Sequence, residues 1–197
     1  EPLKPQLYSW GLIPFWVKNT ESAKRISNQT INARGESIFE KPSFRSSARY
    51  KRCIVLLDAF YEYFHFNKQT YPYHVSMKNN EPLLVAGLWD SWTSKETGEI
   101  IHSVSIVTTK ANQLMKKIHN NPKAKEPRMP VILYHSARDW LQPLKNQSDI
   151  KNIKALIRPA PDEMLDAYTV PKLKGKEGTG NTENAIKKMV YPELSIL

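Results

Sequence analysis

Alternation of apolar and polar residues predicts a series of strands between residues 51 and 108. Lys51–Tyr63 is rich in β-branched and aromatic residues with single polar interruptions, which fits one buried strand or two strands joined at a bend. Further strands are predicted over Tyr71–Met77, Leu83–Trp92 and Ile100–Thr108, with a turn-like segment at residues 93–98 joining the last two. Because these three strands follow one another with short links, we expect an antiparallel meander.

Helical patterns are fewer and lie mainly in the second half of the chain. Apolar spacing predicts a helix over Lys110–Ile118 with Thr109 as its N-cap. Shorter helices are predicted over residues 137–141 and over Ser148–Ile157. Residues 172–184 are rich in Lys, Gly, Thr and Asn, and we interpret them as an exposed basic loop.

The length and composition indicate a folded protein of mixed α and β structure. The 197 residues are 40% hydrophobic and 24% charged, with no internal repeat, so we expect a single domain over residues 1–197. Strand-like sequence begins within ten residues of Glu1, which is not a methionine. We therefore expect the native N-terminal segment to be missing from this sequence.

Charge and cysteine content narrow the possible partners. Lys and Arg total 29 against 19 for Asp and Glu, a formal net charge of +10, which favours nucleic acid first and anionic membranes second. The single cysteine, Cys53, excludes a disulfide framework and suits a reducing compartment, so a cytoplasmic location is expected. No apolar run approaches the roughly 20 residues that span a bilayer. We expect a soluble monomer without a membrane partner.

Metal and cofactor motifs are absent from the sequence. The five histidines lack the spacing of metal ligands, and the sequence contains no phosphate-binding loop, dinucleotide fingerprint or G-x-S-x-G motif. We therefore expect neither a metal nor a cofactor. Cys53 precedes the apolar residues 54–56, so a buried, inert thiol is a better interpretation than a nucleophile.

Two tryptophans bracket a break in regular structure near the N-terminus. Trp10 lies in strand-like sequence and is expected to be a core residue. Trp16 follows the break at Gly11 and Pro14, and it could either fill the core or stack on an unpaired base.

Polar and cationic residues follow at positions 32–52. Asn32 could orient a carbonyl or hydroxyl group and Arg34 could hold a phosphate, although solvated loop residues of these types are common. Arg45 belongs to a cluster of cations interleaved with aromatic residues, a composition that favours a nucleic-acid surface.

Glu62 and His119 are candidates for proton transfer. Glu62 lies between aromatic residues in a predicted strand, where it could sit in a partly buried pocket suited to acid–base chemistry or face water at a sheet edge. His119 ends a predicted helix, where a histidine commonly interacts only with the helix dipole.

Taken in order, six sequence blocks resemble the SOS-response-associated peptidase (SRAP) family, whose members process abasic sites in single-stranded DNA. The blocks extend from Trp10 to residue 133, and the resemblance continues to Trp140. They read W-G-L-I-P-x-W, N-A-R-x-E, R-C-I-V with F-Y-E-Y, A-G-L-W-D, I-V-T-T-x-A-N, and I-H followed by R-M-P-V-I-L.

The resemblance implies an α+β fold with a curved, mainly antiparallel or barrel-like sheet, a few peripheral helices and a basic groove for DNA. It also implies that an N-terminal cysteine, freed by self-cleavage, forms a thiazolidine crosslink with the ring-opened sugar, and it raises the possibility of lyase activity. By the same resemblance, three residues have catalytic roles and four bind DNA. The catalytic residues are Asn32, which holds the sugar, Glu62, which moves protons, and His119, which opens the ring; the DNA-binding residues are Trp16, Arg34, Arg45 and Arg128.

Two departures from the family pattern affect this interpretation. The N-terminal Cys-Gly-Arg segment is not in the sequence, and Cys53 matches an internal strand position that cannot replace it. Residues Asn120–Pro127 separate His119 from Arg128, where many relatives have one residue.

Three functions therefore remain open from the sequence. The chain could be an abasic-site crosslinking enzyme, a cysteine-type peptidase acting on other proteins, or a non-catalytic module that binds single-stranded DNA. The basic net charge favours the first and third.

Overall fold

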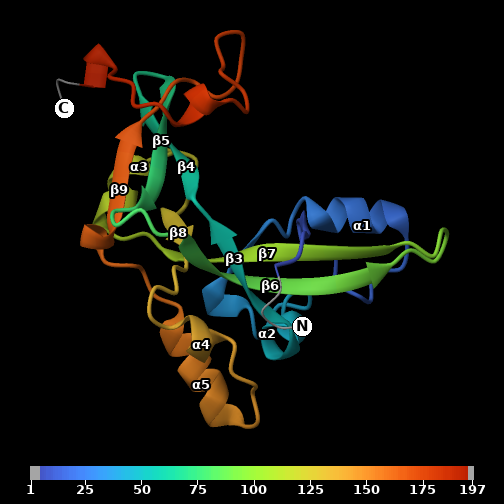
Figure 1. Ribbon diagram of the computed structural model, residues 1–197. Helices are drawn as coiled ribbons and strands as arrows, with labels where there is room; N and C mark the ends of the chain where they lie inside the picture. The colour runs from blue at the N-terminus through green and yellow to red at the C-terminus, as the bar shows by residue number, and fades with distance from the viewer. Residues whose placement is uncertain (1–4, 195–197) are drawn as a thin grey trace. The chain divides into compact units, whose positions relative to one another are not determined.

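The computed structural model describes residues 5–194, and the chain folds into two compact units (Figure 1). Unit 1 contains the chain up to Val55 together with Leu84–Thr109 and Pro130–Arg158. Unit 2 contains Leu56–Leu83, Lys110–Met129 and the chain from Pro159 onward. Each unit is therefore assembled from segments that are distant in sequence.

Most residues of a six-stranded sheet belong to unit 1. The order of its main strands is β1 (Ser9–Trp10), β7 (Ile100–Lys110), β6 (Leu83–Thr93) and β3 (Arg52–Leu57). Two further strands, β2 (Asn32–Arg34) and β8 (Arg128–Pro130), also pair with β7. The β6–β7 pair is antiparallel, with Gly87 opposite Ile106. In contrast, β1 and β2 run parallel to β7, with Arg34 opposite Thr108.

Alternate residues of β6 face the core of unit 1. Leu88 packs in a cluster to which α2 (Arg45–Tyr50), α4 (Ala137–Trp140) and α5 (Gln147–Leu156) contribute apolar residues. Further along β6, Trp92 packs with Ala23 of α1 (Thr20–Ser27), and this helix lies along the β6–β7 hairpin in Figure 1. The turn Gly35–Ser37 is the short 3-10 helix η1 of this unit.

Unit 2 is built on a three-stranded antiparallel sheet in the order β4 (Ala59–Phe66), β5 (Gln69–Met77), β9 (Leu165–Thr169). The β4–β5 turn consists of Asn67 and Lys68, both with positive φ, as a two-residue hairpin of type I′ geometry requires. Helix α3 (Gln113–Ile118) contacts β4. The remaining elements are three 3-10 helices, η2 (Asp162–Met164), η3 (Glu183–Ile186) and η4 (Pro192–Leu194).

The predicted α+β class is confirmed, and in the described residues the two sheets do not close into a barrel. The stretch at residues 51–63 forms two strands, β3 and β4, that are interrupted at Asp58. Of the predicted loop at residues 172–184, residues 172–182 contain no helix or strand, whereas Glu183 and Asn184 begin the 3-10 helix η3. The prediction of one domain over the whole chain stays a prediction.

The predicted meander is wrong. β5 pairs with β4 and β9, whereas β6 pairs with β7 in the other sheet. Alternation identifies each strand but carries no information about its partner, which long-range packing decides.

The predicted start of the helix at Lys110–Ile118 is also wrong. Lys110 continues β7, and Ala111 donates a backbone hydrogen bond to Pro127 at 3.1 Å. The helix begins at Gln113, and the side chain of Asn112, not Thr109, accepts the capping hydrogen bond from Met115 N. Strand β7 thus extends two residues further than the pattern indicated.

Candidate functional site

Glu62 and His119 meet in unit 2. Glu62 projects from β4, and His119 is the C-cap residue of α3, so contact between this helix and strand brings the two side chains together. Glu62 Oε2 lies 3.1 Å from His119 Nδ1, and the side chains are 24% and 22% exposed. The carboxylate is therefore partly buried against an imidazole instead of facing water.

The partners of His119 fix its tautomer. Its Nδ1 also lies 3.1 Å from the carbonyl oxygen of Arg128. Because a carboxylate and a carbonyl are both acceptors, Nδ1 carries a proton and donates it to them. Among the described contacts, Nε2 is then the ring nitrogen left to exchange a proton with a substrate. The second carboxylate oxygen, Glu62 Oε1, accepts from the backbone N–H of Tyr63 at 2.9 Å.

Arg128 joins this group through its backbone and its side chain. Its carbonyl accepts from His119, and its guanidinium Nη1 lies 3.2 Å from Glu126 Oε2. The side chain of Arg128 is only 12% exposed. Arg128 therefore contacts His119 through its backbone and Glu126 through its guanidinium.

Trp16 lies on a bend of unit 1 that buried groups hold in place. The bend presents two neighbouring aromatic side chains, Phe15 at 56% and Trp16 at 45% exposure. The indole of Trp92 donates to the carbonyl of Val17 at 2.7 Å, and Ser103 Oγ accepts from the N–H of Ile13 at 2.8 Å. The rings are therefore carried on an ordered backbone.

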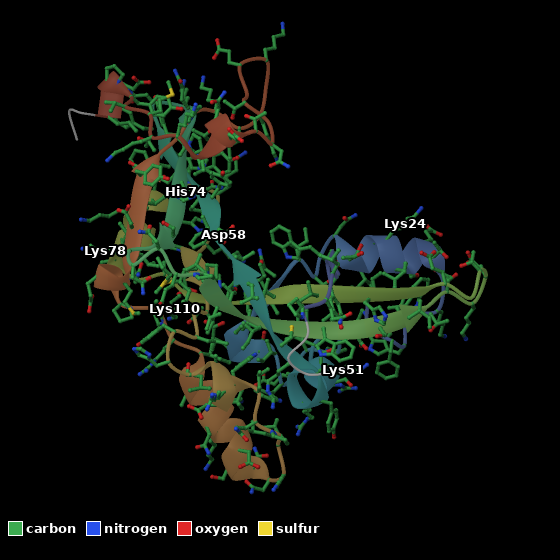
Figure 2. The ribbon with its side chains drawn as sticks, in the orientation of Figure 1. Lys24, Lys51, Asp58, His74, Lys78 and Lys110 are labelled. Atoms are coloured by element: carbon green, nitrogen blue, oxygen red, sulfur yellow. The ribbon has the colours of Figure 1, made fainter. Side chains whose placement is uncertain are left out.

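A buried carboxylate completes this support. Asp90 accepts the N–H of Phe15 at 3.0 Å and the ammonium of Lys51 at 2.5 Å. Lys51, labelled in Figure 2, also lies over the rings of Phe15 and Trp89. The sequence analysis did not single out Phe15 or Asp90, whereas Lys51 belongs to the predicted cluster of cations that contains Arg45. Asp90 could have been found from the sequence, because it alternates with Leu88 and Trp92 on the core-facing side of a strand. A buried carboxylate at such a position requires hydrogen-bonding partners.

The expectation that Trp10 is a core residue is wrong. Its ring is 61% exposed, and its indole N–H donates to the carbonyl of Ile31 at 2.9 Å. The strand that carries it, β1, has two residues and adds to β7 alone. Such a short strand lacks the covering layer that would bury a large ring.

Asn32, Arg34 and Arg45 are exposed residues of unit 1. Asn32 and Arg34 alternate with the buried Ala33 in β2, so they share the outer face of this strand. Arg45 is the first residue of α2, a helix that the sequence analysis did not predict. Of the seven expected site residues, the structure brings Glu62, His119 and Arg128 together in unit 2 and places Trp16, Asn32, Arg34 and Arg45 in unit 1.

Cys53 has the environment of an unreactive thiol. Burial raises its pKa to about 12. Within residues 5–194 no group of three or more His, Cys, Asp or Glu side chains is arranged to hold a metal ion. No helix in this part of the chain has the length and apolar character needed to cross a membrane.

The fold and site define a class of two-sheet α+β proteins with a partly buried carboxylate–imidazole pair. The sequence pattern of the SOS response associated peptidase (SRAP) family matches residues 2–176, and the chain belongs to this family. It is 37% identical over 166 residues to the abasic site processing protein YoqW of Bacillus subtilis (strain 168), covering 83% of this chain and 68% of YoqW. It is 32% identical over 152 residues to the abasic site processing protein HMCES of Xenopus tropicalis, covering 67% of this chain and 43% of HMCES.

Solved structures share the fold. A protein from Bacteroides thetaiotaomicron superposes with a TM-score of 0.83 at 36% identity, covering 94% of this chain and 77% of the other. A protein from Bordetella bronchiseptica gives a TM-score of 0.72 at 30% identity, covering 83% and 75% of the two chains. These similarities agree with the α+β architecture described above.

Cys53 is expected to resist thiol reagents in the folded protein. With a pKa of about 12, only about one thiol in ten thousand is ionised at pH 8. Labelling by a thiol-specific disulfide reagent at pH 8 should be at least about 100-fold slower in buffer than in urea, where burial is lost. Equal rates in the two solutions would contradict this assignment.

Proposed function

We propose that this chain processes abasic sites in single-stranded DNA by covalent capture of the ring-opened sugar. The observation that carries the proposal is the 3.1 Å contact between Glu62 and His119 in a member of the SRAP family. Relatives named abasic site processing proteins and the net charge of +10 support DNA as the partner.

The first chemical step is opening of the deoxyribose ring. The cyclic sugar becomes an aldehyde when its C1 hydroxyl loses a proton and its ring oxygen gains one. His119 suits this exchange, because its Nδ1 proton is held by Glu62 and the Arg128 carbonyl while Nε2 accepts or returns a proton. Asn32, on the exposed face of β2 in unit 1, is proposed as a hydrogen-bonding group for the bound DNA.

The second step is condensation of the aldehyde with an aminothiol. The amine adds to the carbonyl carbon, water leaves, and the thiol sulfur attacks the resulting imine to close a thiazolidine, with one water released overall. Glu62 would accept a proton from the adding amine and return it to the hydroxyl group that departs as water. This reaction requires an amine and a thiol on adjacent carbons, which an N-terminal cysteine provides. Cys53 cannot supply them, because its nitrogen is in a peptide bond.

The cationic and aromatic groups described above would hold the strand. Arg34, Arg45 and Arg128 would bind phosphates, because guanidinium groups match phosphate oxygens in charge and geometry. Trp16 would stack on a base beside the lesion. A single strand is the favoured form, since its unpaired bases are accessible to an aromatic side chain.

Crosslinking is expected to require an N-terminal cysteine together with Glu62. The chain beginning at Glu1 should not trap a single strand that contains an abasic site. A version grafted with the N-terminal segment of a family member that begins Cys-Gly-Arg should give a band of reduced mobility on denaturing electrophoresis. In the grafted protein, Glu62→Gln should slow crosslinking by about 10²–10⁴-fold, the usual contribution of general acid–base catalysis.

The exposed Glu163 provides a control of matched charge in the same unit. Glu163→Gln should leave the rate within about twofold of the grafted protein, because surface substitutions remote from a site have small effects. A crosslink formed by the chain beginning at Glu1, or an unchanged rate in Glu62→Gln, would contradict the proposed chemistry.

Binding is expected to favour single strands and to depend on Trp16. Affinity for an unstructured oligonucleotide should exceed that for its duplex and should fall linearly with salt on a logarithmic plot. Trp16→Ala should cost about 1–3 kcal/mol of binding free energy, the range for loss of a base stack. Trp10→Ala removes another exposed indole of unit 1 and should cost less than about 1 kcal/mol. Fluorescence anisotropy across a salt series measures the affinity of each variant and its salt dependence. Equal losses of affinity in Trp16→Ala and Trp10→Ala, or an affinity that does not change with salt, would contradict the proposal.

A further inference from the structure

The loop that separates His119 from Arg128 is fixed at both ends. The side chain of Asn120 accepts the N–H of His65 at 2.6 Å and donates to its carbonyl at 2.9 Å, which ties the start of the loop to β4. At the other end, the carbonyl of Pro127 accepts the N–H of Ala111 at 3.1 Å. Residues 120–127 therefore form a built part of unit 2 beside the carboxylate–imidazole pair.

Glu126, near the end of this loop, bridges two cations with its two carboxylate oxygens. Oε1 lies 3.3 Å from Lys110 Nζ, and Oε2 lies 3.2 Å from Arg128 Nη1. The side chains of Lys110, Glu126 and Arg128 are 68%, 38% and 12% exposed, so solvent reaches the group from the lysine side. Figure 2 labels Lys110, the last residue of β7.

Lys110 and Arg128 together bind one anionic group, the carboxylate of Glu126. An ammonium and a guanidinium that together hold two carboxylate oxygens also offer the donors that two phosphodiester oxygens accept. The site is connected to the proposed chemistry through Arg128, whose backbone carbonyl accepts the Nδ1 proton of His119. A phosphate bound there would belong to the DNA backbone close to the reacting sugar.

We propose that Lys110 and Arg128 form a phosphodiester subsite that Glu126 occupies in the free protein and leaves when single-stranded DNA binds. The inference rests on the proposed function, since DNA is the ligand. The pair between Lys110 and Glu126 is largely exposed, and such pairs contribute little to stability. Displacement of Glu126 is therefore easy, but its negative charge opposes the incoming phosphate at short range.

A purely structural ion pair predicts a different outcome. If Glu126 only stabilised the loop, its neutralisation would loosen the loop and would weaken DNA binding or leave it unchanged. If it competes with phosphate, neutralisation strengthens DNA binding while Lys110→Ala weakens it. The two roles therefore differ in the sign of the effect.

The test is the affinity of the chain for an unstructured oligonucleotide, measured by fluorescence anisotropy at several salt concentrations. Glu126→Gln should bind about tenfold more tightly than the unmodified chain at low salt, because a carboxylate at contact distance from the phosphate site is removed. Its slope on the logarithmic salt plot should stay close to that of the unmodified chain, because Lys110 and Arg128 neutralise the same phosphate in both complexes. Lys110→Ala should bind more weakly, with a shallower slope.

Glu81→Gln is the matched control, because Glu81 is an exposed residue of the same unit. Each glutamine variant removes one negative charge from a chain of net charge +10. We expect Glu81→Gln to change affinity by less than about twofold, since an exposed charge away from the ligand is screened. Thermal unfolding of every variant verifies that the fold is retained.

The outcomes separate this inference from the proposed function. Equal gains of DNA affinity in Glu126→Gln and Glu81→Gln would contradict the subsite but not DNA binding. A loss of affinity in Glu126→Gln with its fold retained would do the same. Failure of the unmodified chain and of all variants to bind single-stranded DNA would overturn the proposed function, and with it the ligand assigned to this site.

Discussion

The backbone of β7 has to be satisfied along both of its edges, and much of unit 1 follows from this constraint. Ser105–Thr109 of β7 are buried, so their N–H and C=O groups need protein partners. β6 supplies one edge through antiparallel pairing. The other edge is supplied by short segments: Gly11 donates to Val104, and Ile106 donates to Ile31. Residues 9–11 and 31–34 are thereby aligned on β7, which fixes the ends of the segment that carries the Phe15–Trp16 bend and the exposed face of β2.

Polar groups then set the position of the site residues more finely than apolar packing could. A buried carboxylate such as Asp90 is tolerated because it has partners, here an ammonium and backbone N–H groups, and it fixes the Phe15 amide by a directional bond. In unit 2, the Arg128 carbonyl and Glu62 together fix the ring of His119. In both units, aromatic or titratable side chains are held by hydrogen bonds to neighbouring elements.

The sequence predicted local elements well and their long-range partners poorly. Alternation identified β5, β6 and β7, and a polar break at Asp58 was compatible with the separation of β3 from β4. Alternation could not place β5 and β6 in different sheets, because partner choice depends on packing between distant segments. For the same reason, Glu62 and His119 were recognisable only as separate candidates until α3 and β4 were seen in contact. Trp10 was misassigned because residue type predicts burial only when a covering layer is present.

The central claim is that Glu62 and His119 act on the sugar of an abasic site. The most direct measurement is a crystal structure of the chain with a single-stranded oligonucleotide that carries a tetrahydrofuran analogue of the abasic sugar. We predict the furan ring beside this pair, with the ring carbon that replaces C1 of the sugar within about 4 Å of His119 Nε2 or of the Glu62 carboxylate. An analogue bound away from Glu62 and His119, with the DNA otherwise ordered, would contradict the claim.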